Sequence, residues 1–156
     1  MDKPRILFVS SYHGTRSRIA EEFVNKLAPG KAEACSSSFE SGKIDPLAIA
    51  VMGEIGIELS SEGPKTVFAR HGDREAFDFI VTLSEGAARG HLSVFEVNVD
   101  ALFTRSAQRH HWSVPSFENV DATGEQRWNR ARKIRDMIRR KVAALPPQAG
   151  VRIDIE

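Results

Sequence analysis

Residues 5–20, which read RILFVSSYHGTRSRIA, decide the fold of this chain. The apolar, β-prone run at 6–9 predicts a buried strand, and the small polar residues after it, with one glycine, predict a tight loop. Arg16 and Ser17 then lead into a helical pattern, in which apolar residues recur every four positions at Ile19, Phe23 and Leu27. We therefore predict the order strand, loop, helix.

A loop between a buried strand and a helix N-terminus is a typical site for an anion. The backbone N–H groups of such a loop converge, and the positive end of the helix dipole points to the same place. Arg16 at the lip adds a planar, bidentate donor for a phosphate-like oxyanion. A cation at a helix N-terminus is unfavourable without an anion, which favours this interpretation over a surface ion pair. The predicted anion-binding loop consists of Ser10, Ser11, Tyr12, His13, Gly14, Thr15 and Arg16.

Length and composition predict a single domain, residues 1–156, with 41% apolar and 28% charged residues. The net charge of +1 favours neither a nucleic acid nor a membrane partner. We see no membrane-length apolar run and no signal-peptide pattern, so we expect a cytoplasmic protein. The only cysteine, Cys35, excludes an internal disulfide and a CxxC motif. The sequence carries no signal for the oligomeric state.

Further strands are predicted where short apolar runs recur. The clearest covers 77–83, is nearly all apolar, and suits the centre of a parallel sheet. Weaker candidates cover 32–36 and 107–114, and 94–100 fits either a strand or an extended loop. Because strands alternate with helices, we expect an α/β fold: a three-layer α/β/α domain with a central four-stranded parallel sheet. Ligands bind beyond the carboxyl ends of such strands, where the predicted anion loop lies.

The remaining helices are predicted from caps and periodicity. Asp45 as N-cap and Pro46 at the first helical position begin one helix. Single turns or short helices are expected at 73–76 and 84–90. A long amphipathic helix is expected over 124–145, with basic residues on a solvated outer face. Its predicted inner stripe is Trp128, Ala131, Ile134, Ile138 and Val142.

The order and spacing of these stretches resemble the low-molecular-weight protein tyrosine phosphatases and their thioredoxin-coupled arsenate reductase relatives. The resemblance covers most of the chain. It is carried by residues 6–9, Arg16-Ser17 followed by 19–21, residues 45–57, residues 77–81, His111-Trp112 before Pro115, and the closing basic helix.

The resemblance implies roles for four positions. In the family a cysteine thiolate in the loop attacks phosphorus or arsenic, while the loop amides and the arginine hold the oxygens. The serine after the arginine hydrogen-bonds the thiolate, and an aspartate on a distant loop protonates the leaving group. By position these are Ser10, Arg16, Ser17 and Ser116. A cysteine at position 10 would complete the signature Cys-x5-Arg-Ser.

Two of these positions lack the required chemistry. A serine hydroxyl has a far higher pKa than a cysteine thiol and needs an adjacent base, and only His13 is near Ser10 in the loop. Ser116 is no general acid, although Glu118 or Asp121 could act from a displaced loop. Ser17 is equally well explained as a helix cap.

The loop and the positions of the reductase cysteines also differ from the family pattern. Tyr12-His13 stands where the family usually has Gly-Asn, so Gly14 is expected to supply the unusual backbone freedom. The reductase cysteines would fall near Ser84 and His91, and Cys35 lies on a different segment. One engineered Cys-to-Ser exchange would change position 10 alone. Several departures together favour a naturally degenerate site.

Three hypotheses follow. The first is a phosphatase-like pseudoenzyme that binds a phosphate-like anion or a phosphorylated ligand without efficient turnover. The second is an active phosphotyrosine phosphatase or arsenate reductase seen as a Cys-to-Ser variant. The third is a non-catalytic protein-interaction module. No cofactor is expected, and no metal, because His110 and His111 are adjacent in a predicted strand and point to opposite faces.

Overall fold

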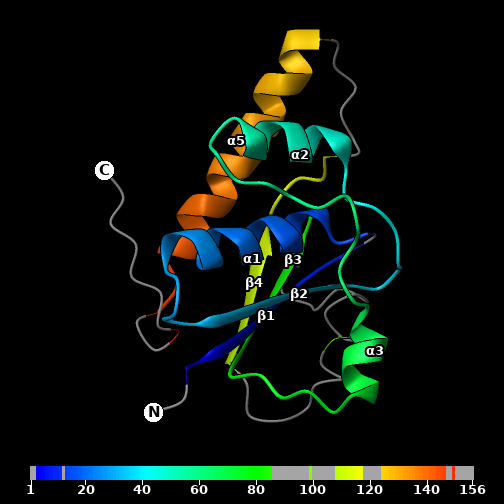
Figure 1. Cartoon of the computed structure of the whole chain (residues 1–156), viewed down its shortest axis with the longest axis vertical. Coiled ribbons are helices and arrows are strands. Elements are labelled where there is room, and N and C mark those ends of the chain that lie inside the picture. The colour runs from blue at the N-terminus through cyan, green and yellow to red at the C-terminus, as the bar shows by residue number, and fades with distance from the viewer. Residues whose placement is uncertain are drawn as a thin grey trace.

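Four parallel strands form the central sheet, in the order β2-β1-β3-β4 (Figure 1). The computed structural model describes residues 3–11, 13–85, 99, 108–117, 124–146 and 149. The strands are β1 (Arg5–Ser10), β2 (Glu33–Ser38), β3 (Phe79–Ser84) and β4 (Gln108–Ser113). The predicted four-stranded parallel sheet is therefore confirmed. Only the predicted bounds shift by a few residues.

The strand register aligns the carboxyl ends at one edge of the sheet. Ser10, the last residue of β1, pairs with Ser38 on one side and with Leu83 on the other. Leu83 in turn pairs with Trp112 of β4. The segments that follow β1, β3 and β4 therefore leave the sheet at the same edge, where ligands of such folds bind.

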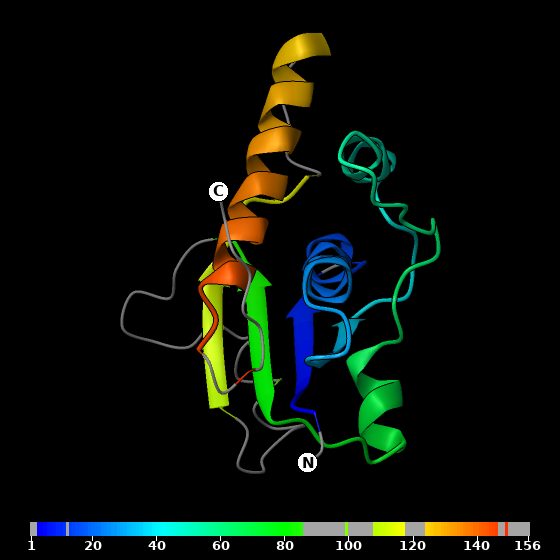
Figure 2. The same cartoon turned by 60° about the vertical axis from the view of Figure 1, so that its left-hand side comes forward.

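Helices cover both faces of the sheet, as predicted (Figure 2). The helices α1 (Thr15–Leu27), α2 (Pro46–Gly53) and α5 (Gly124–Ala143) contribute to the larger apolar core with Phe8 and Val81. The short α3 (Val67–Gly72) belongs to the opposite face, where Val67 packs with Leu7, Val9 and Ile80. No helix in the described part of the chain is long and apolar enough to cross a membrane.

The start of α2 is confirmed, because the Asp45 carboxylate accepts a hydrogen bond of 2.8 Å from the Leu47 N–H. The turn predicted at 73–76 is wrong. Helix α3 occupies 67–72 instead, and the Thr66 hydroxyl caps it by accepting from the Ala69 N–H. Of the helix predicted at 84–90, Ser84 belongs to β3, and residues 86–90 lie outside the described part. So does the segment predicted at 94–100, except for residue 99.

Helix α5 corrects one predicted core residue. Ala131, Ile134, Ile138 and Val142 are buried, but Trp128 is 37% exposed. The first turns of α5 extend beyond the sheet (Figure 2). Trp128 lies in these turns, so it does not pack into the apolar core. Its ring is covered instead by the Arg132 guanidinium, 5.7 Å from the ring centroid.

Candidate functional site

The predicted anion loop joins the carboxyl end of β1 to the first turn of α1. Its last bend is made by Gly14, which takes φ 84° and ψ 21°, the left-handed region predicted for it. A Cβ at Gly14 would lie 2.5 Å from Pro64 Cγ, so the close approach of Pro64 also requires glycine. Thr15 ties the loop to α2, because its hydroxyl accepts from the Asp45 N–H at 3.2 Å. Tyr12 lies outside the described residues.

Ser10, at the nucleophile position, is fully buried, and among the described residues its hydroxyl forms hydrogen bonds with Ser17 alone. Its hydroxyl donates to the Ser17 hydroxyl at 2.9 Å and accepts from the Ser17 N–H at 3.2 Å. The Ser17 hydroxyl in turn points its proton at the carbonyl oxygens of Gly14 and Ser37. No imidazole or carboxylate takes the Ser10 proton among the described contacts, so this geometry does not activate the hydroxyl as a nucleophile.

Arg16 joins the loop to the segment that follows β4. One Nη donates to the Val114 carbonyl and the other to the Ser11 hydroxyl, each at 2.8 Å. The residue is only 3% exposed, so the guanidinium lies buried between the loop and the segment that follows β4. The carbonyl of a residue 98 positions away draws it inward. A hydrogen bond between residues so far apart in the chain cannot be predicted from the sequence pattern.

Ser116, at the general-acid position, is buried two residues beyond Val114. Its backbone N–H donates to the Glu85 carboxylate at 2.9 Å. Glu85 directly follows β3 and was not predicted as a site residue, although a carboxylate just after a strand at the ligand edge was a readable signal. Glu118 and Asp121 lie outside the described residues.

His13 lies against the neighbouring segment around residues 40–42. A Cβ at Gly42 would lie 2.5 Å from His13 Cδ2, which shows how closely the imidazole covers that backbone. Its Nε2 is 3.7 Å from the Glu40 carboxylate. The imidazole is absent from the described hydrogen bonds of the Ser10 hydroxyl, which bonds Ser17.

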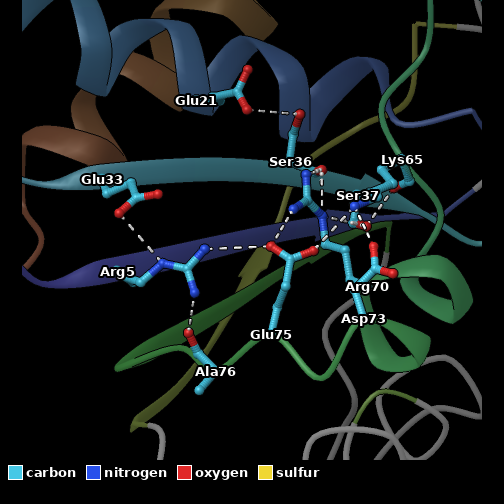
Figure 3. Close-up of polar contacts among 10 residues, drawn as sticks. All are labelled: Arg5, Glu21, Glu33, Ser36, Ser37, Lys65, Arg70, Asp73, Glu75 and Ala76. Atoms are coloured by element: carbon cyan, nitrogen blue, oxygen red, sulfur yellow. Dashed lines mark hydrogen bonds and ion pairs between the residues drawn. The ribbon is translucent and has the colours of Figure 1, made fainter.

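A further group of polar contacts holds Ser36 and Ser37 near the end of β2 (Figure 3). The Arg70 guanidinium, from α3, donates to the Ser36 carbonyl at 2.9 Å and to the Ser37 hydroxyl at 3.2 Å. Glu75 accepts from Arg70 at 2.9 Å and also pairs with Arg5. Since the Ser37 carbonyl accepts from Ser17, this network fixes the acceptor on which the Ser10–Ser17 pair depends.

Cys35 is not placed to act as a relay thiol. It lies midway along the edge strand β2, where it pairs with Leu7 away from the carboxyl ends of the strands, and it is half-buried against the apolar face opposite α1. Burial raises the pKa of its thiol, although the charges of Arg70 and Arg5 act in the opposite direction. Of the other predicted redox positions, Ser84 ends β3, and His91 lies outside the described residues.

The adjacent histidines of β4 point to opposite faces, as predicted. His110 stacks on Phe79 with ring centroids 6.2 Å apart, and His111 Nδ1 lies 2.7 Å from the Thr82 hydroxyl. Among the described residues, no group of three or more His, Cys, Asp and Glu side chains is placed to hold a metal ion.

Comparisons with known proteins agree with this architecture. An arsenate reductase of Halalkalibacterium halodurans is 27% identical over 145 residues, which cover 91% of this chain and 94% of the relative. An arsenate reductase of Shouchella clausii is 28% identical over 139 residues, 88% of this chain and 91% of the relative.

Among solved structures, an arsenate reductase in its oxidized state superposes with a TM-score of 0.70 at 25% identity, covering 91% of this chain and 95% of that one. Vibrio vulnificus Wzb, solved in complex with benzylphosphonate, shares the fold with a TM-score of 0.64 at 17% identity, over 92% of this chain and 100% of Wzb. The family profile described as low molecular weight phosphotyrosine protein phosphatase matches residues 5–151. The chain therefore belongs to the low molecular weight phosphotyrosine protein phosphatase family.

Proposed function

We propose that this chain binds tetrahedral, phosphate-type oxyanions in the loop at 10–16 without turning them over efficiently. The observation that carries the proposal is the hydrogen bond of Ser10, whose hydroxyl donates its proton to the Ser17 hydroxyl and not to a base. The Gly14 bend, the start of α1 and the Arg16 guanidinium supply the elements of an anion site, while the nucleophile is a neutral hydroxyl.

The names of the relatives extend the ligand class to arsenate, since several of them are arsenate reductases. Arsenate and phosphate share a tetrahedral shape and a similar charge, so a loop suited to one suits the other. Reduction of arsenate by a thiol relay needs cysteines at the site. The one cysteine of this chain, Cys35, pairs with Leu7 away from the ligand edge. Binding without reduction therefore fits the residues better than reductase activity.

The test is calorimetric titration with phosphate, arsenate and vanadate, together with an assay of p-nitrophenyl phosphate hydrolysis. We expect saturable binding and no hydrolysis that depends on Ser10. Arg16→Ala should weaken binding at least about tenfold, because hydrogen bonds to charged groups contribute about 1.5–3 kcal/mol. Lys31→Ala, an exposed cation beyond the other end of α1, is the control and should bind as the unaltered protein does.

Two results would contradict the proposal in different ways. Clear hydrolysis that disappears in Ser10→Ala would establish an active phosphatase. If none of the anions binds, the third hypothesis, a non-catalytic protein-interaction module, would be favoured. Because Arg16 is buried, the thermal midpoint of each variant is measured as well. Arg16→Lys, which keeps the charge and loses the planar fork, provides a second variant should Arg16→Ala fail to fold.

A further inference from the structure

The segment Val114–Ser116 is held from two sides by groups of opposite charge. Arg16, from the anion loop, donates to the Val114 carbonyl at 2.8 Å. Glu85, from the end of β3, accepts from the Ser116 N–H at 2.9 Å. The Arg16 guanidinium of the proposed site and the Glu85 carboxylate therefore both bind the segment Val114–Ser116, two residues apart.

The sheet register supports this placement independently. Ser10 pairs with Leu83, and Glu85 follows Leu83 by two residues, so both the anion loop and Glu85 leave the same edge on adjacent strands. Glu85 is exposed, so a small solute has access to its carboxylate. Its bond to the Ser116 N–H fixes the orientation of the group while a carboxylate retains further lone pairs as acceptors.

We propose that Glu85 selects the protonation state of the bound oxyanion, an inference that rests on the proposed anion-binding function. An ionised carboxylate accepts hydrogen bonds and donates none. It therefore favours an oxyanion that still carries a proton and repels one that carries none. Inorganic phosphate and arsenate retain a proton near neutral pH, whereas sulfate, of the same shape, is fully ionised. The site then prefers phosphate and arsenate over sulfate.

The experiment compares phosphate, arsenate and sulfate affinities of the full chain by calorimetry near neutral pH. We expect the unaltered protein to bind phosphate at least about tenfold tighter than sulfate, in line with the strength of a hydrogen bond to a charged group. Glu85→Gln should tighten sulfate binding, because its amide is neutral and donates, and should reduce the phosphate-to-sulfate ratio by about tenfold. The control Glu62→Gln removes another exposed carboxylate, one paired with Lys43, and should leave the ratio unchanged.

Each other outcome overturns the inference. Equal weakening of phosphate and sulfate in Glu85→Gln would show that Glu85 only positions the segment around Ser116. Unchanged affinities for both phosphate and sulfate would show that the carboxylate does not meet the ligand. In both cases anion binding itself survives, so the proposed function stands. If none of the three anions binds to the unaltered protein, the proposed function fails and this inference fails with it.

Discussion

A single atom at residue 10 decides what chemistry the loop can perform. A thiol in place of the Ser10 hydroxyl would meet the Ser17 N–H, which donates to position 10 beside the start of α1 and would favour a thiolate. The Ser17 hydroxyl, which here accepts from Ser10, would have to rotate to donate as well. We expect Ser10→Cys to gain weak p-nitrophenyl phosphate hydrolysis, because Ser116 supplies no acid. Adding Ser116→Asp should raise kcat at least about tenfold, since general acids typically contribute 10²–10⁴-fold.

The matching control is Ser10→Ala, alone and with Ser116→Asp, which should be inactive in both forms. If the single and double cysteine variants hydrolyse at the same rate, position 116 does not serve as the acid position.

Individual side chains also show which contacts cannot be predicted from the sequence. The contact between Ser10 and Ser17 was implied by the family resemblance, and both residues belong to one strand–loop–helix unit. The Glu85 contact with Ser116 was not predicted, since it joins residues 31 positions apart across two strands. Trp128 was assigned to the core on periodicity alone, and periodicity does not tell how far a helix extends beyond the sheet.

At the scale of elements, the bend between β1 and α1 depends on Gly14. We expect Gly14→Ala to lower the free energy of unfolding by more than the cost of about 1–2 kcal/mol for a left-handed non-glycine residue, because the new Cβ would meet Pro64. Gly30→Ala is a matched control. Gly30 takes φ 77°, and a Cβ there meets no atom within 4 Å. Urea denaturation of both variants measures the difference.

Pro64→Ala in the Gly14→Ala background should recover the part of the loss due to the clash. Should Gly14→Ala and Gly30→Ala cost the same, the close approach of Pro64 to the loop would be disproved.

The elements themselves were predicted where local signals are strong. Apolar runs placed β1 and β3, and the Asp45-Pro46 pair placed the start of α2. The strands β2 and β4, which are largely polar, were only weaker candidates. In place of the turn expected at 73–76, helix α3 begins six residues earlier in the chain, and its start is marked only by the Thr66 cap. Helix α3 has six residues and one buried position, Val67, so it offers no periodic stripe to read.

At the scale of the whole molecule, the site is held by contacts that cross every layer. The Arg70 network on the α3 side fixes Ser36 and Ser37 of β2 (Figure 3). On the α1 side, Glu21 and Arg18 contact the Ser36 hydroxyl, with the Glu21 carboxylate accepting its proton at 3.3 Å. Both helical layers thus converge on the end of β2 that supports Ser17.

This convergence makes Glu21 a measurable probe of the packing between α1 and β2. Burial raises the pKa of the Glu21 carboxyl above its ordinary value of 4.5 and outweighs the lowering effect of Arg18, and Glu22 raises it further. The folded state therefore binds a proton more tightly than the unfolded state does. The contribution of Glu21 to stability is fully present below the unfolded pKa and is lost as the pH rises through the folded pKa.

Glu21→Gln removes this titration, because the amide is neutral at every pH. We expect the free energy of unfolding of Glu21→Gln, relative to that of the unaltered protein, to rise as the pH increases from about 4.5 toward neutrality. Urea denaturation at several pH values measures this difference, and Glu58→Gln, at an exposed position, controls for the loss of one negative charge. A difference that stays constant or falls with increasing pH would mean that Arg18 and Ser36 stabilise the ionised carboxylate at least as much as burial penalises it. It would also mean that α1 lies less closely against β2 than these contacts require.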